Sequence, residues 1–482
     1  MASEQKITVN FLVDKVKQRV VLAEADSDFV DILFSFLTLP LGTIIRLLNK
    51  QSHIGCMDKL YESVENLDVK IFQTESCKTM LLFPRSAAEE RCEDLKVNIC
   101  RAVLSPRTTY MCQKPDCCAK TTCFASSVPK ARCPYCQETM DMIRAWHKSD
   151  VDADKLFVKS GYKFIISDDL HITPASVEHC LSLIQKLGIE NACILEHKAM
   201  DLGTGEILTL LGRLLVSYFP LTDLFFKNVG VANNVSSGVD VRSMIHVKGE
   251  GDAEAESNEI DINLFVTKAN QEVSFVEAGG EFVNLVLSFL MLPLGSLISL
   301  KNEQSVMGSV DNLYWSAENF GVENFKSEEC KNILVSPKLG PFCGYNDSML
   351  KLDESSPHEF SMRGCFSCYM KNNNTECAAS KCAHGVERAT LRELNPKSPV
   401  GGTETRGGYA KGKFLVTADL RVSPLSTAST TQIIKNLAIS VCNLVPKRVV
   451  LGLGEIQALN LLRSAVTSKT PIDEALGTRQ KH

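Results

Sequence analysis

The feature that most constrains the fold of this chain is an internal repeat. Residues 10–84 align with residues 263–337 at a constant offset of 253, without a gap, and about 35 of the 75 aligned positions are identical. Leu39-Pro40-Leu41-Gly42, for example, recurs as Leu292-Pro293-Leu294-Gly295. A second stretch, residues 163–187, aligns with residues 413–437 at an offset of 250. Two copies of each of two stretches predict a duplicated chain.

The repeat divides the 482 residues into two halves, which suits a length beyond the ~250–300 residues at which single cores stop growing. The first half, residues 1–230, is expected to hold module A1 (5–84), a Cys-rich insert (85–148) and module B1 (150–230). The second half, residues 261–482, is expected to hold module A2 (261–337), a second Cys-rich insert (338–400) and module B2 (408–482). Between them, residues 231–260 end in small and acidic residues, which favours a solvated linker over the alternative, a long surface loop within one domain.

Hydrophobic patterning predicts an α+β fold, in which duplicated modules of β-hairpins carry covering helices and two Cys-rich inserts. In module A1 we expect a hairpin of residues 6–13 and 19–24, followed by a helix that starts near residue 29 after a cap at Asp26 or Ser27. A second helix is expected at residues 56–66 and a short strand at residues 80–83. In module B1 we expect strands at residues 155–158 and 162–166 and a helix at residues 176–187, capped by Ser176 and stopped by Gly188. A final helix is expected at residues 203–217. Because hairpins precede helices, the sheets are expected to be mixed rather than doubly wound.

One apolar segment, residues 29–48, invites a membrane interpretation. It carries Asp31 and Arg46 and is interrupted by Pro40-Leu41-Gly42, which would break a spanning helix. Two buried helical stretches joined at this break fit better, so we expect no membrane association. The polar N-terminal residues show no secretory signal, and we therefore expect an intracellular protein of the cytoplasm, the nucleus or both.

The 19 cysteines are many for an intracellular chain, and ten of them fall within residues 112–136 and 365–382. In the first insert, a pair with four intervening residues and a CxxC pair have the spacing of zinc ribbons or knuckles. We select Cys112, Cys117, Cys133 and Cys136 as zinc ligands. Cys118 could replace Cys117, Cys123 is a spare, and unpaired reduced thiols or a redox switch are the alternatives.

The second insert has the same two kinds of pair in reversed order. We select Cys365, Cys368, Cys377 and Cys382 as its ligands, with His384 as a substitute for Cys382. Four complete ligands favour structural zinc, because a catalytic site keeps one position open. Zinc would order short polar loops that cannot fold by burial alone.

The sequence contains no recognisable catalytic motif. The chain has no GxxxxGK[ST], GxSxG or HExxH pattern. Asp168-Asp169 resembles an acid pair, but its counterpart is Ala418-Asp419, and a turn is the better interpretation. We therefore expect a non-enzymatic, zinc-stabilised scaffold or interaction protein inside the cell, whose partner is another protein or, alternatively, a small ligand. An enzyme with a site between the halves is one alternative.

Nucleic-acid binding through a zinc knuckle is a further alternative. The first insert carries Lys114, Lys120, Lys130 and Arg132 among aromatic residues, which could contact a single strand. Basic residues equally well compensate thiolate charge, and the formal net charge of -5 does not favour a protein held mainly by phosphate contacts.

These motifs together resemble a large plant family known as domain of unknown function 674. The resemblance rests on residues 34–42 with their copy 287–295, on residues 163–170 with 413–420, on the Leu60-Tyr61 and Leu313-Tyr314 segments, on the Cys pairs and on the C-terminal Gly-Glu-Ile-like motif. It covers nearly the whole chain. It implies a plant source and brings with it neither an activity nor a cofactor.

Overall fold

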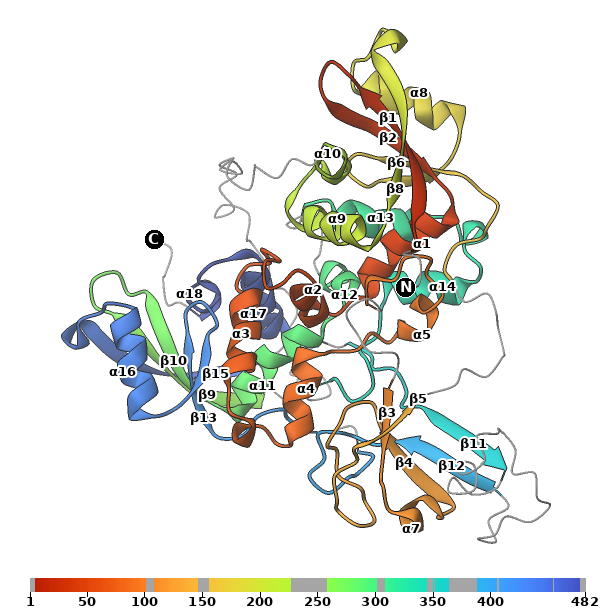
Figure 1. Cartoon of the computed structure of the whole chain (residues 1–482). Helices are drawn as coiled ribbons and strands as arrows, with labels where there is room; N and C mark the ends of the chain where they lie inside the picture. The colour runs from red at the N-terminus through yellow and green to blue at the C-terminus, as the bar shows by residue number, and fades with distance from the viewer. Residues whose placement is uncertain are drawn as a thin grey trace.

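The computed structural model describes residues 5–100, 108–145, 156–226, 258–300, 308–344, 350, 352–363, 388–404, 407–453 and 455–476. Within these ranges the chain is a mixture of helices and three five-stranded sheets, which confirms the α+β class. The helices lie mainly between the sheets, as Figure 1 shows. No helix of the described residues is long and apolar enough to cross a membrane.

The first sheet joins strands from both ends of the first half. The hairpin of β1 and β2 forms its centre, and every pairing in the sheet is antiparallel. The strand order is β7-β6-β2-β1-β8. The strands are β1 (Ile7–Asp14), β2 (Arg19–Ala25), β6 (Phe164–Ser167), β7 (Ile172–Pro174) and β8 (Leu195–Leu202).

The second sheet has the corresponding order in the second half, β14-β13-β10-β9-β15, and is also antiparallel throughout. A central hairpin is again flanked by strands that come later in the chain. The strands are β9 (Asn258–Thr267), β10 (Val273–Gly279), β13 (Lys413–Thr417), β14 (Val422–Pro424) and β15 (Leu444–Leu453). The division into domains at the boundaries given above stays a prediction, as does a duplicated origin.

The third sheet combines strands of the two Cys-rich inserts, which sequence patterning treats as separate. Its order is β11-β12-β4-β3-β5, and β12 pairs with β4 in parallel. The first insert supplies β3 (Thr108–Met111), β4 (Thr122–Ser126) and β5 (Met142–Ala145), and the second supplies β11 (Glu359–Arg363) and β12 (Arg388–Glu393). The inserts are therefore parts of one layer, at the bottom of Figure 1.

Helices form where the pattern predicted them and also in places where it predicted none, and one expected strand is an exception. In the first half they are α1 (Ser27–Ser35), η1 (Phe36–Thr38), α2 (Leu41–Leu47), α3 (Met57–Asn66), η2 (Val69–Ile71), α4 (Glu75–Leu82), α5 (Glu89–Cys92), α7 (Pro115–Cys118), α8 (Val177–Lys186), η3 (Ala192–Ile194), α9 (Thr204–Val216) and α10 (Pro220–Phe225). In the second half they are α11 (Gly280–Ser288), η5 (Phe289–Met291), α12 (Leu294–Ser299), α13 (Val310–Asn319), η6 (Val322–Asn324), α14 (Glu328–Val335), α16 (Thr427–Asn436), η7 (Val441–Asn443), α17 (Glu455–Thr467) and α18 (Pro471–Leu476).

The exception is the strand expected at residues 80–83, which is wrong because these residues end helix α4. Cys77, Met80 and Leu81 recur at helical spacing and are buried, so the apolar run belongs to a helix face. Similarly, residues 156–158 form only an isolated bridge at Val158. The expected Ser176 cap is confirmed, since its hydroxyl accepts a hydrogen bond from His179 N at 3.1 Å.

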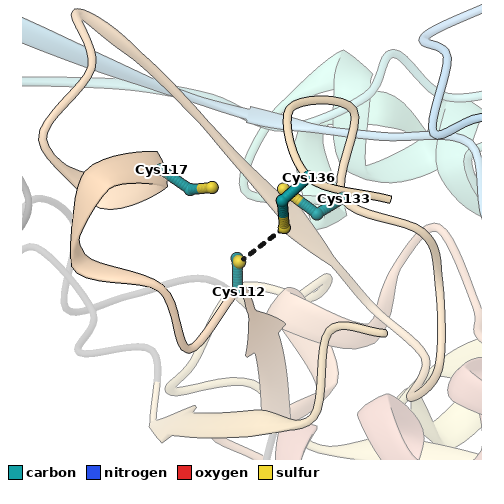
Figure 2. Close-up of side chains that lie close together, drawn as sticks. All are labelled: Cys112, Cys117, Cys133 and Cys136. Carbon is teal, nitrogen blue, oxygen red and sulfur yellow. Dashed lines mark hydrogen bonds between the residues drawn. The ribbon is translucent and has the colours of Figure 1, made fainter. Parts of the chain in front are cut away.

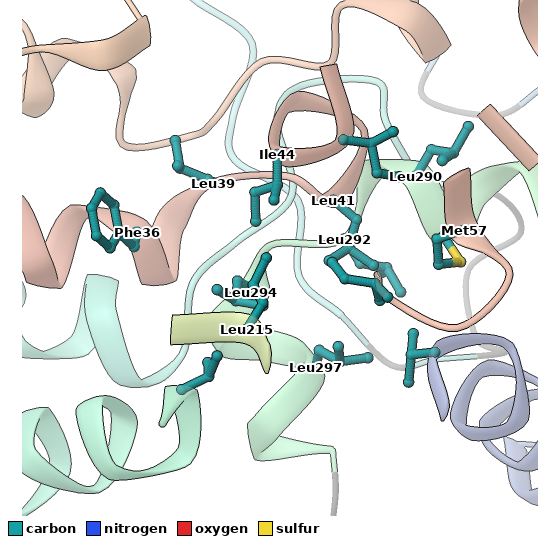
Figure 3. Packing of buried hydrophobic residues seen from close by; sticks show 14 of the residues in the cluster. Phe36, Leu39, Leu41, Ile44, Met57, Leu215, Leu290, Leu292, Leu294 and Leu297 are labelled. Atoms are coloured by element: carbon teal, nitrogen blue, oxygen red, sulfur yellow. The ribbon is translucent and has the colours of Figure 1, made fainter. Parts of the chain in front are cut away.

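The Leu-Pro-Leu-Gly breaks bring the two halves together at the centre of the molecule. Leu41 N donates to Leu292 O and Leu294 N donates to Leu39 O, each at 2.9 Å, around a bridge between Pro40 and Pro293. Figure 3 shows the apolar side chains that surround this crossing, among them Ile44 and Leu297. The break therefore joins two buried helical stretches, as expected, and also forms the contact between the halves.

Each half also places a helix against the sheet of the other half. Ser63 on α3 accepts a hydrogen bond from Val422 N, and Ser316 on α13 accepts one from Ile172 N, both at 3.0 Å. Lys59 of α3 forms an ion pair with Asp419 at 2.9 Å. As a result, one hydrophobic core extends from Ile7 to Ile472.

Candidate metal centre

Four cysteines of the first insert converge on one point beside the third sheet. The sulfur atoms of Cys112, Cys117, Cys133 and Cys136 all lie within 4.8 Å of one another, and their side chains point toward a common centre (Figure 2). The Sγ atoms of Cys112 and Cys136 are 3.5 Å apart. Four sulfurs at Zn–S distances of 2.3 Å stand roughly 3.8 Å apart in a tetrahedron. The spacing is therefore that of a four-thiolate site that could hold a metal ion.

Cys112 and Cys117 are held by the end of β3 and by the short helix α7. Pro115 opens α7, where its missing N–H costs no hydrogen bond, and the single turn carries Cys117 back toward Cys112. The backbone N–H of Lys114 points at the Cys112 sulfur at 3.4 Å. A donor of this kind stabilises negative charge on a thiolate.

Cys133 and Cys136 are presented by a tight hairpin turn. Cys133 N donates to Glu138 O at 2.9 Å, and Gln137 N donates to Cys133 O at 2.8 Å. Gln137 has a positive φ of 61°, which folds the chain back after Cys136. Both sulfurs consequently face the same side of the turn, so the CxxC spacing supplies two ligands to one centre.

Burial and mutual contacts shift the pKa values of three of the four thiols. Burial raises the pKa of Cys112 well above its ordinary value and raises the pKa of Cys117 to about 12. Burial acts the same way on Cys136, but the Glu138 N–H and hydrogen bonds from the other three thiols outweigh it and lower the pKa of Cys136. One thiolate is thus stabilised at the expense of its neighbours. A bound divalent cation would favour ionisation of all four and release their protons.

The second half forms one wall of this cluster. Leu394, which follows β12, packs with Ala131, Met140 and the cysteines, and its N–H donates to Ala125 O at 2.9 Å. The side-chain amide of Gln137 donates to Val400 O at 3.1 Å. Sequence reasoning missed this wall because no spacing rule connects residues 394–400 to residues 131–137.

The remaining cysteines of the inserts are placed differently. Cys118 and Cys123 are buried in a separate apolar cluster with Met111 and Leu391, and the Cys118 thiol donates to Cys112 O at 3.4 Å. Cys117, rather than Cys118, is the member of the quartet. The ligands selected in the second insert, Cys365, Cys368, Cys377 and Cys382, lie outside the described residues, as does His384.

The Asp168-Asp169 pair occupies the turn between β6 and β7. Asp168 is buried, which raises its pKa, and it accepts hydrogen bonds from Thr222 N at 2.8 Å, Thr222 Oγ1 at 2.7 Å and Arg19 Nε at 3.2 Å. These bonds tie the turn to β2 and to the start of α10. The carboxylate is therefore occupied by structural partners.

A pocket at the junction of the two halves contains chemistry that no sequence pattern indicated. His358 and Glu393 face each other there, with Nδ1 and Oε2 2.8 Å apart, and Arg85 of the first half lies in the same wall. Residues 35 apart in the sequence are brought together only by the antiparallel pairing of β11 with β12. A search for short motifs has no signal for such a pair.

Comparison with known families gives a match over nearly the whole chain. The family model described as "Protein of unknown function (DUF674)" matches residues 3–452. The chain belongs to this family. Comparisons with curated proteins and with solved structures both gave no match.

Membership in DUF674 confirms the resemblance seen in the repeated motifs. The match reaches from β1 into β15, and the helices α17 and α18 lie beyond it. Because the description of the family contains no activity, any function of this DUF674 protein has to be argued from the chemistry of its own residues.

Proposed function

We propose that this DUF674 protein is a non-enzymatic scaffold, stabilised by structural zinc, that binds other proteins inside the cell. The observation that carries the proposal is the convergence of four thiols within 4.8 Å. A complete set of four cysteine ligands leaves no open position for a substrate, which is the property of structural rather than catalytic zinc. Free thiols of this kind need a reducing compartment, so a cytoplasmic or nuclear location is part of the proposal.

The position of the quartet supports a structural role. It lies between the strands of the first insert and the wall formed by residues 394–400 of the second half. The apolar clusters of this layer are small compared with the main core, so burial alone contributes little to its stability. A metal ion would therefore fasten the first insert and, through its wall, the second half.

A second zinc ion in the other insert is also part of the proposal, with Cys365, Cys368, Cys377 and Cys382 as ligands. Their spacing, two and four intervening residues, supports it. The metal content of the purified protein tests both sites at once. We expect one or two equivalents of zinc per chain by elemental analysis, and less than half an equivalent would remove both sites.

Paired substitutions assign the ligands. Changing Cys133 and Cys136 to Ser should lower the zinc content by one equivalent and lower the melting temperature. Changing Cys365 and Cys368 to Ser should remove a second equivalent if the second site exists. Cys193, which is exposed and lies outside both groups, provides the control, since Cys193→Ser should change neither quantity. Unchanged zinc in the first variant would reject that ligand set.

The partner is tested by isolating the protein from its native source with bound proteins. A protein recovered in constant ratio with the wild type should bind the purified chain directly. Recovery of a low-molecular-weight compound that the chain converts would instead favour the alternative, an enzyme with its site between the halves. The junction pocket with His358 and Glu393 is the observation that favours this second candidate.

Nucleic-acid binding receives less support from the geometry. Lys114 forms an ion pair with Glu138 at 2.8 Å, and Lys130 forms one with Glu75. Arg132 donates to Gln137 O at 3.0 Å. These basic groups are compensated locally rather than presented to phosphates. An affinity for single-stranded nucleic acid that falls steeply with salt would restore this candidate.

A further inference from the structure

The pocket at the junction of the halves has mixed apolar and charged walls. It has a volume of about 80 Å³, and its walls come from both halves. Met80, Val128 and Met291 contribute apolar surface, while Arg85 and Ser355 contribute polar groups. Ligand pockets for drug-sized molecules measure roughly 300–1,000 Å³. This one therefore has room for a small molecule or a terminal group, and none for a nucleotide cofactor.

The charged groups of the pocket contact one another. Arg85 Nε donates to Glu89 Oε2 at 2.7 Å. His358 Nδ1 lies 2.8 Å from Glu393 Oε2, and burial of this carboxylate is outweighed by its contacts with His358, which lower its pKa. The third carboxylate, Glu90, lies 3.3 Å from His358 Nε2, and its side chain is 44% exposed. Glu90 therefore shares the His358 imidazole with Glu393, and water screens part of its charge.

Two hydrogen-bond donors of the pocket lack acceptors. Within the described part of the chain, the Nη1 and Nη2 groups of Arg85 have no hydrogen-bond partner. The Ser355 hydroxyl oxygen is buried and also has no partner. A buried hydroxyl without a partner is destabilising, so Ser355 calls for a hydrogen-bond partner inside the pocket. The Arg85 side chain is 23% exposed, and its outer edge is open to an acceptor there.

We propose that this pocket binds a small carboxylate. The outer edge of a guanidinium, with Nη1 and Nη2 side by side, matches the two oxygens of a carboxylate in spacing and in charge. Ser355 supplies a further donor, and Met80, Val128 and Met291 cover a short apolar body. The site goes beyond the scaffold function, since it requires neither zinc nor a protein partner.

The test is a calorimetric titration of the full-length protein with butyrate. Butyramide is the neutral control ligand, and butylammonium is the control ligand of opposite charge. We expect butyrate to bind more tightly than either match. Arg85→Lys keeps the charge but loses the forked geometry and should weaken butyrate binding about tenfold or more. Glu90→Gln removes a neighbouring negative charge and should tighten it.

Ser355→Ala keeps the test decisive if the Arg85 variant does not fold, because it removes only a hydroxyl and should weaken butyrate binding severalfold. The proposal is overturned if the wild type shows no butyrate binding, or if the folded Arg85→Lys and Ser355→Ala proteins bind it as well as the wild type does. It is also overturned if butylammonium binds more tightly than butyrate and Glu90→Gln abolishes that binding. In that case the pocket is a cation site.

Discussion

Asp31 and Asn284, which occupy the same position in the two repeats, make similar contacts with different chemistry. Asn284 Oδ1 accepts hydrogen bonds from Tyr409 N at 2.8 Å and Ala410 N at 2.7 Å, while its Nδ2 donates to Ala410 O. Asp31 Oδ1 accepts from Phe157 N and Val158 N, both at 2.9 Å. The carboxyl of Asp31 is almost fully buried, and this burial raises its pKa to about 7.

The first prediction concerns the pH dependence that Asp31 imposes on folding. Its folded pKa is raised above the ordinary value of 3.8, so the folded protein holds this proton more tightly than the unfolded chain does. The stabilisation is fully present below about pH 4 and is lost as the pH rises toward 7, with a slope of at most about 1.4 kcal/mol per pH unit. Asp31→Asn should remove this contribution. The measurement is the free energy of unfolding in urea across this pH range, for wild type and variant.

The difference between the two proteins isolates Asp31 from the other titrating groups. If the two curves run parallel from pH 4 to pH 7, Asp31 does not titrate as proposed. The sequence shows only an acid in an apolar segment at this position. That it faces two buried N–H groups depends on where residues 157–158 pass, which is a tertiary fact.

At the scale of elements, the crossing of the two Leu-Pro-Leu-Gly segments depends on the absence of a side chain at Gly42 and Gly295. A Cβ atom on Gly42 would lie 3.1 Å from Leu290 O, and one on Gly295 would lie 3.1 Å from Leu37 O. Each glycine thus allows close approach of the backbone of the other half. Local pattern predicted the helix break at Pro40, whereas the requirement for glycine comes from tertiary neighbours in the same half and in the half about 250 residues away.

The second prediction tests this close approach with a matched pair of substitutions. Gly42→Ala should destabilise the protein by about 1–3 kcal/mol, because the added methyl group has to displace backbone atoms. Gly205→Ala is the control: it also lies in a helix, α9, but a Cβ there meets nothing within 4 Å. It should be neutral or stabilise by up to about 1 kcal/mol. Chemical denaturation measures both, and equal effects would contradict the packing argument.

The third prediction concerns the layer made by the two inserts. If zinc occupies the four-cysteine site, a strong chelator should lower the melting temperature and loosen the third sheet first. Amide hydrogen exchange should then accelerate in β4 and β12 more than in β1 and β2, because the first two strands adjoin the metal site. Uniform acceleration over the whole chain, or none, would show that the metal does not fasten this layer.

At the scale of the whole molecule, the exchange of helices between halves makes the halves interdependent. The α3 helix packs against β14 and the α13 helix packs against β7, so each sheet is completed by the opposite half. The shared hydrophobic core extends across both. Among the described residues, each half adds only one small apolar cluster of its own to this shared core.

The fourth prediction follows from this shared core. The first and second sheets should unfold in a single cooperative transition, despite a chain length at which separate domains are common. Probes beside each sheet, for instance fluorophores on the exposed Cys193 in η3 and Cys442 in η7, should give the same midpoint in urea. Two separated midpoints would mean that the halves fold independently. Changing Ser63 to Ala, which removes a contact between the halves, should shift both probes together.

The sequence by itself determined the local features of this protein. It predicted the hairpins, most helices, the break at Pro40 and which cysteines of the first insert belong together, because caps, periodicity and ligand spacing act within a few residues. Only the tertiary structure decided that α3 and α13 cross to opposite sheets, that the inserts share one sheet and that Arg85 and His358 line one pocket. The physical reason is that the repeats have nearly the same surfaces. Packing within a half or across halves would bury similar apolar groups, so the local sequence cannot distinguish the two arrangements.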